Sequence, residues 1–186
     1  MNTVMILILL IVIIICLILG IYMYLYNKIQ DYIVKINEIE AIIDTNLREK
    51  YDNINKCVTI AKNDTRIKNK LDKQVFDELI KIKNRKISNF DFDRTLIETN
   101  NEFEAIKQKY SSLNKNEEII KISKKIIECD EKLEINREYY NNNIAEYNKL
   151  VKLFPTNIIA KICKYEEKLF FDRKDMSDDD YKDFKL

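Results

Sequence analysis

Two asparagines in the carboxyl-terminal half of the chain are the side chains best placed to form a site. Asn141 and Asn148 each follow a tyrosine and lie seven residues apart, about two helical turns, so both amides lie on one helix face. We expect them to meet Asn27 or Asp44 of the first helix. Together these residues form either a polar groove for a peptide or lipid headgroup, or hydrogen bonds that fix helix register. The structural interpretation is favoured, because buried polar groups need partners in any bundle.

Carboxylates offer a second route to chemistry, through general acid-base catalysis or through oxygen ligands for a hard cation. The acidic residues that could serve in this way are Asp91, Asp93, Glu98, Glu102 and Glu104. Their spacing lacks the glycine of a calcium-binding loop, and acidic residues on helices are usually solvated. We therefore expect no metal ion, no cofactor and no catalytic residue.

The composition excludes most other chemistries. The chain contains one glycine, Gly20, and no histidine, so it can build neither a glycine-rich phosphate loop nor a histidine-based triad or zinc site. Its 32 basic and 31 acidic residues almost cancel, so no one-signed patch for nucleic acid is expected. The sequence predicts a protein that is not an enzyme.

An uncharged apolar stretch over residues 4–26 predicts a membrane anchor. At about 1.5 Å per helical residue it is long enough to cross the ~30 Å hydrocarbon core. Three tyrosines near its end are typical of the membrane interface. A cleaved signal peptide fits poorly, because no basic residue precedes the stretch and no small-residue cleavage site follows it. Cys16 follows three isoleucines, so a lipoprotein signal fits poorly too.

The charges beside the anchor give a small bias toward one orientation in the membrane. Lys28 and Lys35 follow it and no basic residue precedes it, so the positive-inside rule places the body in the cytoplasm. Asp31 and Glu38 offset the charge of these lysines. The alternative is therefore a body that lies outside the cytoplasm. We expect a single-pass protein of the cell membrane.

Apolar residues beyond the anchor recur at three- and four-residue steps, which is typical of amphipathic helices. The first stripe continues from the anchor without a helix breaker. It predicts a helix that ends near Lys62, with Asn63 and Asp64 marking the stop. A second helix is predicted over residues 67–82.

Polar segments divide the remainder of the body. Residues 88–93 form a soft break, and a helical pattern then continues to Tyr110. Serines and asparagines over residues 111–116 predict a turn, with Asn116 starting the next helix. That helix has the clearest stripe, over residues 119–154, with a spacing suited to antiparallel, coiled-coil-like packing.

The lone proline, Pro155, ends the long helix because it lacks a backbone donor. A short helix is predicted from Thr156 to about Phe171. The expected domains are thus a transmembrane anchor at residues 1–26, a helical body at 27–172 and an acidic mobile tail at 173–186.

These elements predict an all-α fold, an N-terminal transmembrane helix followed by an elongated antiparallel up-and-down bundle of the four-helix type. The alternative is an extended coiled coil that oligomerises. Intrachain packing is favoured, because the helices between turns are long enough to return along one another. Cys57, Cys129 and Cys163 form no CxxC motif, and we expect them to be small buried hydrophobic residues.

Several segments resemble the LemA family. In residues 43–62 an Ile-Asp pair precedes basic residues and a Tyr-Asp pair, and Tyr26-Asn27 follows the anchor as in that family. Residues 137–161 hold the two Tyr-Asn pairs and the Phe-Pro turn, and residues 170–172 match the end of the family's last helix. The chain departs at Asn55, where the family has proline.

The resemblance implies a membrane-anchored helical bundle, widespread in bacteria, with no established enzymatic activity. It also implies that some relatives carry a lipoprotein cysteine, which would put their domains outside the cytoplasm.

The leading hypothesis is therefore a non-catalytic interaction or scaffold protein at the cell membrane. Its partners are the lipid bilayer, through the anchor, and a protein or a second copy of the chain, with no nucleic acid. The alternative is a signal-relaying protein that passes helix motion from the membrane to the bundle. An enzyme that works through carboxylates alone is the third hypothesis.

Overall fold

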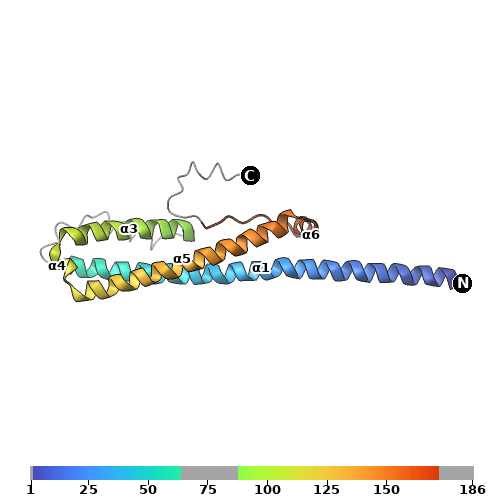
Figure 1. The fold of residues 1–186 in the computed structure, drawn as a ribbon, viewed down its shortest axis with the longest axis horizontal. Coiled ribbons are helices and arrows are strands. Elements are labelled where there is room, and N and C mark those ends of the chain that lie inside the picture. Colours follow the sequence, from blue (N-terminus) through green and yellow to red (C-terminus); the bar gives the residue numbers. More distant parts are fainter. Residues whose placement is uncertain (1, 64–87, 172–186) are drawn as a thin grey trace. The chain divides into compact units, whose positions relative to one another are not determined.

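The computed structural model describes residues 2–63 and 88–171, and every regular element in these two ranges is a helix. This confirms the predicted all-α class. The helices of Figure 1 are α1 (Asn2–Asn63), α3 (Asn89–Lys109), α4 (Ser111–Asn114), α5 (Glu117–Lys152) and α6 (Thr156–Cys163). The helix predicted over residues 67–82 and the tail predicted at 173–186 lie outside the described residues.

The chain divides into two compact units. Unit 1 consists of Met1–Ile39 and Tyr139–Phe170, and unit 2 consists of Glu40–Glu138 and Phe171–Leu186. Helices α1 and α5 each pass from one unit to the other without a break in the helix.

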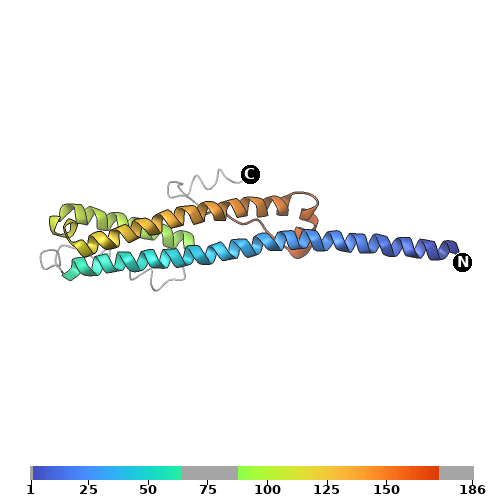
Figure 2. The same cartoon turned by 60° about the horizontal axis from the view of Figure 1, so that its bottom comes forward.

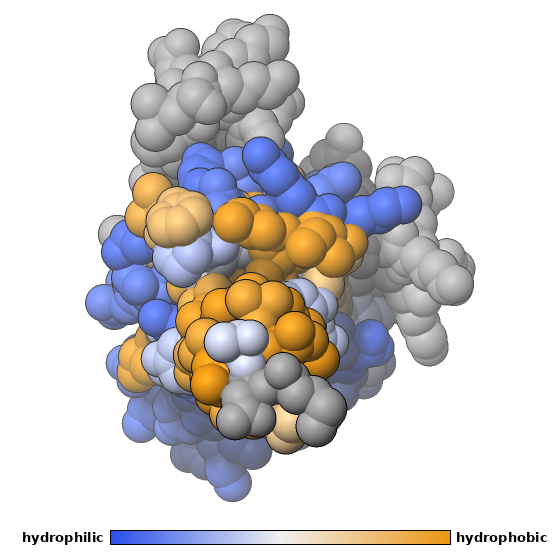
Figure 3. Space-filling view, turned by 90° about the vertical axis from the view of Figure 1, so that its right-hand side faces the viewer, coloured by the Kyte–Doolittle hydropathy of each residue, from blue (hydrophilic) through white to orange (hydrophobic). Residues whose placement is uncertain are grey.

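Unit 1 begins with an apolar part of α1 that no other element covers. Residues 3–24 are all exposed, and the first fully buried side chain of α1 is Ile29. This stretch is long and apolar enough to cross a membrane, and apolar side chains surround its first turns in Figure 3. Past it, α5 and α6 pack against α1. The core residues of unit 1 include Ile29, Ile36, Tyr140, Ile144, Tyr147 and Ile159.

Among the described residues of unit 2, the three long helices α1, α3 and α5 pack together, and their side-chain contacts give their directions. Lys50 of α1 pairs with Asp130 of α5, and Cys57, further along α1, lies near Glu118, earlier in α5. The two helices are therefore antiparallel, with the start of α5 beside the end of α1 in Figure 2. Helix α3 runs parallel to α1, because the tilted rings of Tyr51 and Phe92 lie 6.2 Å apart while Cys57, further along α1, lies near Lys107, further along α3.

The core of unit 2 comes from all three of these helices. Its fully buried apolar side chains include Ile43, Leu47, Ile54, Val58, Leu96, Phe103, Ile119 and Leu133. Cys57 and Cys129 are buried as predicted, whereas Cys163 is only half-buried, and all four cysteines of the chain are free thiols.

Both ends of α5 agree with the sequence prediction, whereas the end predicted for α1 near Lys62 falls at the edge of the described residues, which reach Asn63. Asn116 caps α5, since its Oδ1 accepts hydrogen bonds from the amides of Glu118 and Ile119 at 3.0 and 3.1 Å. Helix α5 ends at Lys152, ahead of Pro155.

Two predicted breaks are shorter than expected. Ser88 accepts a 3.2 Å hydrogen bond from the amide of Asp91, so α3 starts at Asn89 within the predicted break at 88–93. Likewise, the first four residues of the predicted turn at 111–116 form the short helix α4.

The predicted last helix, Thr156 to about Phe171, is wrong in its length. Helix α6 ends at Cys163, because Lys164 takes the left-handed conformation, with φ 57° and ψ 39°. The amide of Tyr165 then donates to the carbonyl of Ala160 at 2.8 Å, which is the Schellman arrangement of a helix end. Residues 165–171 continue without helix.

Candidate functional site

The four predicted site residues fall in both units. Asn27, Asn141 and Asn148 belong to unit 1, and Asp44 belongs to unit 2. Asn27 is exposed, Asn141 is half-buried and Asn148 is buried. The structure thus gives these residues three different environments.

Asn148 holds the chain segment that follows α6. Its Oδ1 accepts a hydrogen bond from the amide of Lys168, and its Nδ2 donates to the carbonyl of the same residue, both at 2.9 Å. The neighbouring Tyr147 hydroxyl donates to the carbonyl of Glu166 at 3.0 Å. These hydrogen bonds from the second Tyr-Asn pair go to residues 165–168 and not to the first helix. They satisfy backbone groups of the non-helical residues that follow α6.

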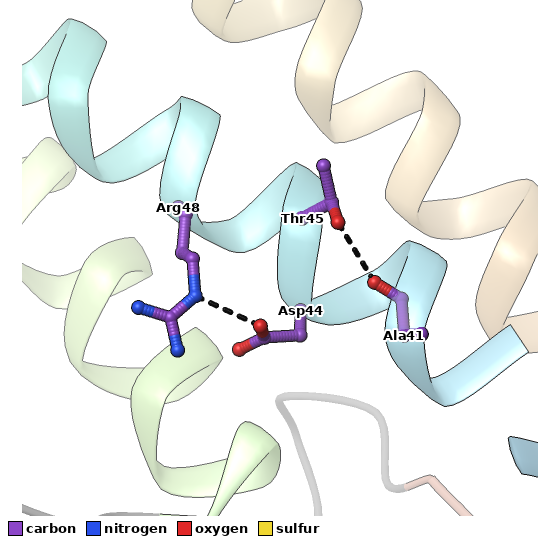
Figure 4. A network of polar contacts seen from close by, with 4 residues as sticks. All are labelled: Ala41, Asp44, Thr45 and Arg48. Carbon is purple, nitrogen blue, oxygen red and sulfur yellow. Dashed lines mark hydrogen bonds and ion pairs between the residues drawn. The ribbon is translucent and has the colours of Figure 1, made fainter. Parts of the chain in front are cut away.

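Asp44 forms an ion pair within its own helix. Its Oδ2 accepts from Nε of Arg48, one helical turn later, at 2.8 Å, and Thr45 donates to the carbonyl of Ala41 at 2.9 Å (Figure 4). The Arg48 side chain is mostly exposed, and exposed pairs at this spacing contribute only about 0.3–0.5 kcal/mol.

Three residues that sequence reasoning missed, Lys50, Asp130 and Arg137, form a buried charge cluster in unit 2 together with Asp93. Nζ of Lys50 lies 2.5 Å from Oδ1 of Asp130, and Nη2 of Arg137 lies 2.5 Å from Oδ2 of Asp93. The side chain of Lys50 is 1% exposed, whereas that of Asp130 is 45% exposed. The cluster joins α1, α3 and α5, and its two positive and two negative charges balance.

Burial dominates the electrostatics of Asp93. Desolvation raises the pKa of this carboxyl, and the nearby charges of Arg137 and Lys50 lower it in part. Oδ1 of Asp93 and Nε of Arg137 are buried without a hydrogen-bond partner. The ring of Phe171 lies 5.5 Å from the Arg137 guanidinium and stacks on Phe90 at 4.4 Å, so aromatic side chains keep water from part of the cluster.

One sequence signal pointed to this cluster. Lys50 lies three residues after Leu47 and four before Ile54, both fully buried, so a charged residue falls within the apolar stripe of α1. A charge at such a position has to find a buried partner. Its partners could not be identified from the sequence alone, because a third of all residues are charged.

The arrangement as a whole can fix helix register, which is the best-attested role of buried polar groups between helices. Over residues 2–63 and 88–171 no group of three or more Asp, Glu, Cys or His side chains is arranged to hold a metal ion. Of the acidic residues that could have offered chemistry, Asp93 pairs with Arg137 and Glu104 pairs with Lys107.

Comparison with known proteins gives one match. The model of the LemA family matches residues 40–182, a range that includes both Tyr-Asn pairs, the buried charge cluster and the Phe-Pro turn. No curated protein and no solved structure matches the chain. Because the match covers most of the sequence, the chain belongs to the LemA family.

Proposed function

We propose that this protein is a membrane-anchored scaffold that binds a protein partner or a second copy of itself and catalyses no reaction. One observation carries the proposal. Helix α1 is uncovered and apolar over residues 3–24 and continues without a break into a helical body that buries its own apolar stripe. A stretch of that length left bare is unfavourable in water and suits the bilayer core.

The chemistry of the described side chains supports binding over catalysis. The buried charges of the cluster in unit 2 are paired, and burial raises the pKa of the Cys57 thiol to about 11. A nucleophilic thiol needs the opposite shift. An enzyme that works through carboxylates would need an acid free to meet a substrate, whereas Asp93 is buried beside Arg137.

We also propose the four-helix up-and-down arrangement for the body. The parallel direction of α1 and α3 supports it, because in such a bundle alternate helices point the same way. The fourth member is the helix that the apolar spacing predicts over residues 67–82. Val75→Pro should then lower the midpoint of thermal unfolding by several degrees, since proline costs a helix interior about 3 kcal/mol. An unchanged midpoint would contradict the four-helix arrangement.

The membrane anchor and the partner are tested in the same cells. The full chain, expressed with a photo-crosslinking amino acid at exposed positions of α5, is recovered in membranes that have been washed with alkaline carbonate. We expect the chain to stay in the washed membranes and to form discrete crosslinked species. A chain released by carbonate contradicts the anchor. An inserted chain that stays monomeric and captures nothing contradicts the scaffold role.

Signal relay is the second candidate, and the continuity of α1 favours it. This helix runs for 62 residues from its apolar start to Asn63, so rotation at the membrane would be transmitted along it. One alanine inserted after Asn27 rotates the following helix by about 100° relative to the anchor, and four alanines nearly restore the phase. A relay predicts that crosslinking to the partner is altered by one alanine and recovered by four. Equal crosslinking by both variants would support the passive scaffold.

A further inference from the structure

An exposed apolar patch lies at the end of unit 1 where α5 turns into α6. Its members are Leu153, Phe154, Ile158 and Ile162. Ile158 and Ile162 are one turn apart on α6, while Ile159 and Ala160 are buried on the opposite face. Helix α6 therefore has an apolar face in the core and a second apolar face that no described part of the chain covers.

Three side-chain contacts show which turns of α1 lie beside the end of α6. The Tyr22 hydroxyl interacts with the Cys163 thiol at the end of α6. Tyr165 interacts with Tyr26, and Nε2 of Gln30 donates to its hydroxyl. Helix α6 thus packs beside the turns of α1 where the uncovered apolar stretch ends.

The surface of a bilayer would lie at these turns of α1. Residues 4–26 span roughly 34 Å as a helix, slightly more than the ~30 Å hydrocarbon core. Tyr22 and Tyr26, which contact the end of α6 and the residue after it, are of the type found at the membrane interface. Viewed from the N-terminal end, a second group of apolar residues lies next to α1 (Figure 3), so an apolar surface faces the side from which α1 would enter the membrane.

We propose that α6 and the turn before it lie in the membrane interface and form a second lipid contact beside the anchor. Phe154 and the two isoleucines enter the boundary between headgroups and acyl chains. Lys161 and Lys164, both exposed, then lie at the level of the anionic headgroups, as in amphipathic interfacial helices. The inference rests on the proposed membrane anchor and adds to it the part of the body that contacts lipid.

The chain contains no tryptophan, so a single introduced tryptophan reports on this contact. Phe154→Trp places it in the patch, where the native phenylalanine is 79% exposed. Tyr139→Trp is the matched control. Tyr139 is 49% exposed and lies near Lys35, roughly 20 Å further along α1 than Tyr22.

Each full-length variant is inserted into vesicles of phosphatidylcholine and phosphatidylglycerol, with lipids brominated just below the headgroup. We expect severalfold stronger quenching for Phe154→Trp than for Tyr139→Trp, and a blue-shifted emission for the first variant alone. Adding Ile158→Ser and Ile162→Ser to Phe154→Trp should reduce the quenching severalfold while the chain stays inserted.

The outcomes separate this inference from the proposed anchor. A chain that alkaline carbonate releases from the vesicles overturns both. A chain that stays inserted but whose tryptophan is as poorly quenched as the control overturns the inference alone. A blue-shifted tryptophan that brominated lipid does not quench also overturns it, because a second copy of the chain would then cover the patch.

Discussion

Among single residues, Asp93 is a buried carboxyl whose environment opposes its charge. Burial raises its pKa, Arg137 is its ion-pair partner, and one of its oxygens has no hydrogen bond. Because its pKa is higher in the folded than in the unfolded state, the folded protein favours the protonated form. The contribution of Asp93 to stability is therefore greatest below about pH 4 and is lost as the pH rises through the raised value.

Arg137→Met should reveal the free-energy cost of burying the Asp93 carboxylate. The carboxylate of Asp93 would stay buried without its partner, which costs about 3–5 kcal/mol of unfolding free energy at neutral pH. Loss of the guanidinium also raises the pKa of Asp93 further, so part of the stability should return as the pH is lowered. Urea unfolding of the detergent-solubilised chain between pH 4 and pH 7 measures both effects.

Two variants control this prediction. Arg94→Met removes an exposed arginine from α3 and should change stability by less than about 0.5 kcal/mol. Asp93→Asn added to Arg137→Met removes the unpaired charge and should recover much of the loss at neutral pH. A loss that is the same at every pH would show that Arg137 stabilises through its contact with Phe171 instead.

Cys57 gives a residue-scale prediction in the alkaline range. Burial raises the pKa of its thiol from 9.0 to about 11. The unfolded chain loses this proton first, so stability is complete below pH 9 and falls between pH 9 and pH 11. Relative to Cys57→Ala, the wild type should lose about 3 kcal/mol over this interval.

Among the elements, the segment after α6 depends on one side chain. Asn148 makes two hydrogen bonds to the backbone of Lys168. Asn148→Leu leaves these backbone groups unpaired, and each buried unpaired group costs about 1–3 kcal/mol. Hydrogen exchange at the Lys168 amide should therefore accelerate strongly, while exchange in the middle of α5 stays slow.

Asn142→Leu is the control, since Asn142 is an exposed neighbour on the same helix, and it should leave the Lys168 amide protected. A different result would favour the polar groove. If Asn148→Leu folds with normal stability and exchange but loses binding to a partner, the asparagine serves a ligand and not the fold.

The same elements show what the sequence can predict. Both ends of α5 follow from local signals, namely the cap at Asn116 and the proline at position 155. The end of α6 does not, because Lys164 takes a left-handed conformation that usually calls for glycine or asparagine. Contacts with Tyr147 and Asn148 hold the chain beyond it, and such tertiary contacts leave no local pattern.

The candidate site was predictable to a smaller degree. The sequence predicts that Asn148 meets Asn27 or Asp44 of the first helix, whereas its hydrogen bonds go to the backbone of Lys168, in a segment expected to be helical. Asp93 and Arg137 are far apart in the sequence and become neighbours only through the packing of α3 on α5. Periodicity identifies which face of a helix is buried, and it does not identify which charge on the next helix lies opposite.

For the whole molecule, the distribution of charge along the chain predicts its orientation. The stretch before Lys28 has no charged side chain, and Lys28 and Lys35 then follow. The positive-inside rule counts basic residues close to the end of a span and gives little weight to acidic ones. We therefore expect the body to lie on the cytoplasmic side in a bacterial host, where protease added to spheroplasts cannot reach it.

The measurement is digestion of spheroplasts followed by detection of the C-terminal residues, with detergent-lysed spheroplasts as the positive control. The wild type should be protected until the membrane is dissolved. Asn2→Lys with Thr3→Lys and Lys28→Asn reverses the charge bias across the span, and should make a fraction of the chains accessible. If the wild type is digested in intact spheroplasts, the body lies outside the cytoplasm and its partners must be sought there. The bias of two lysines would then be too small to outweigh the other determinants of insertion.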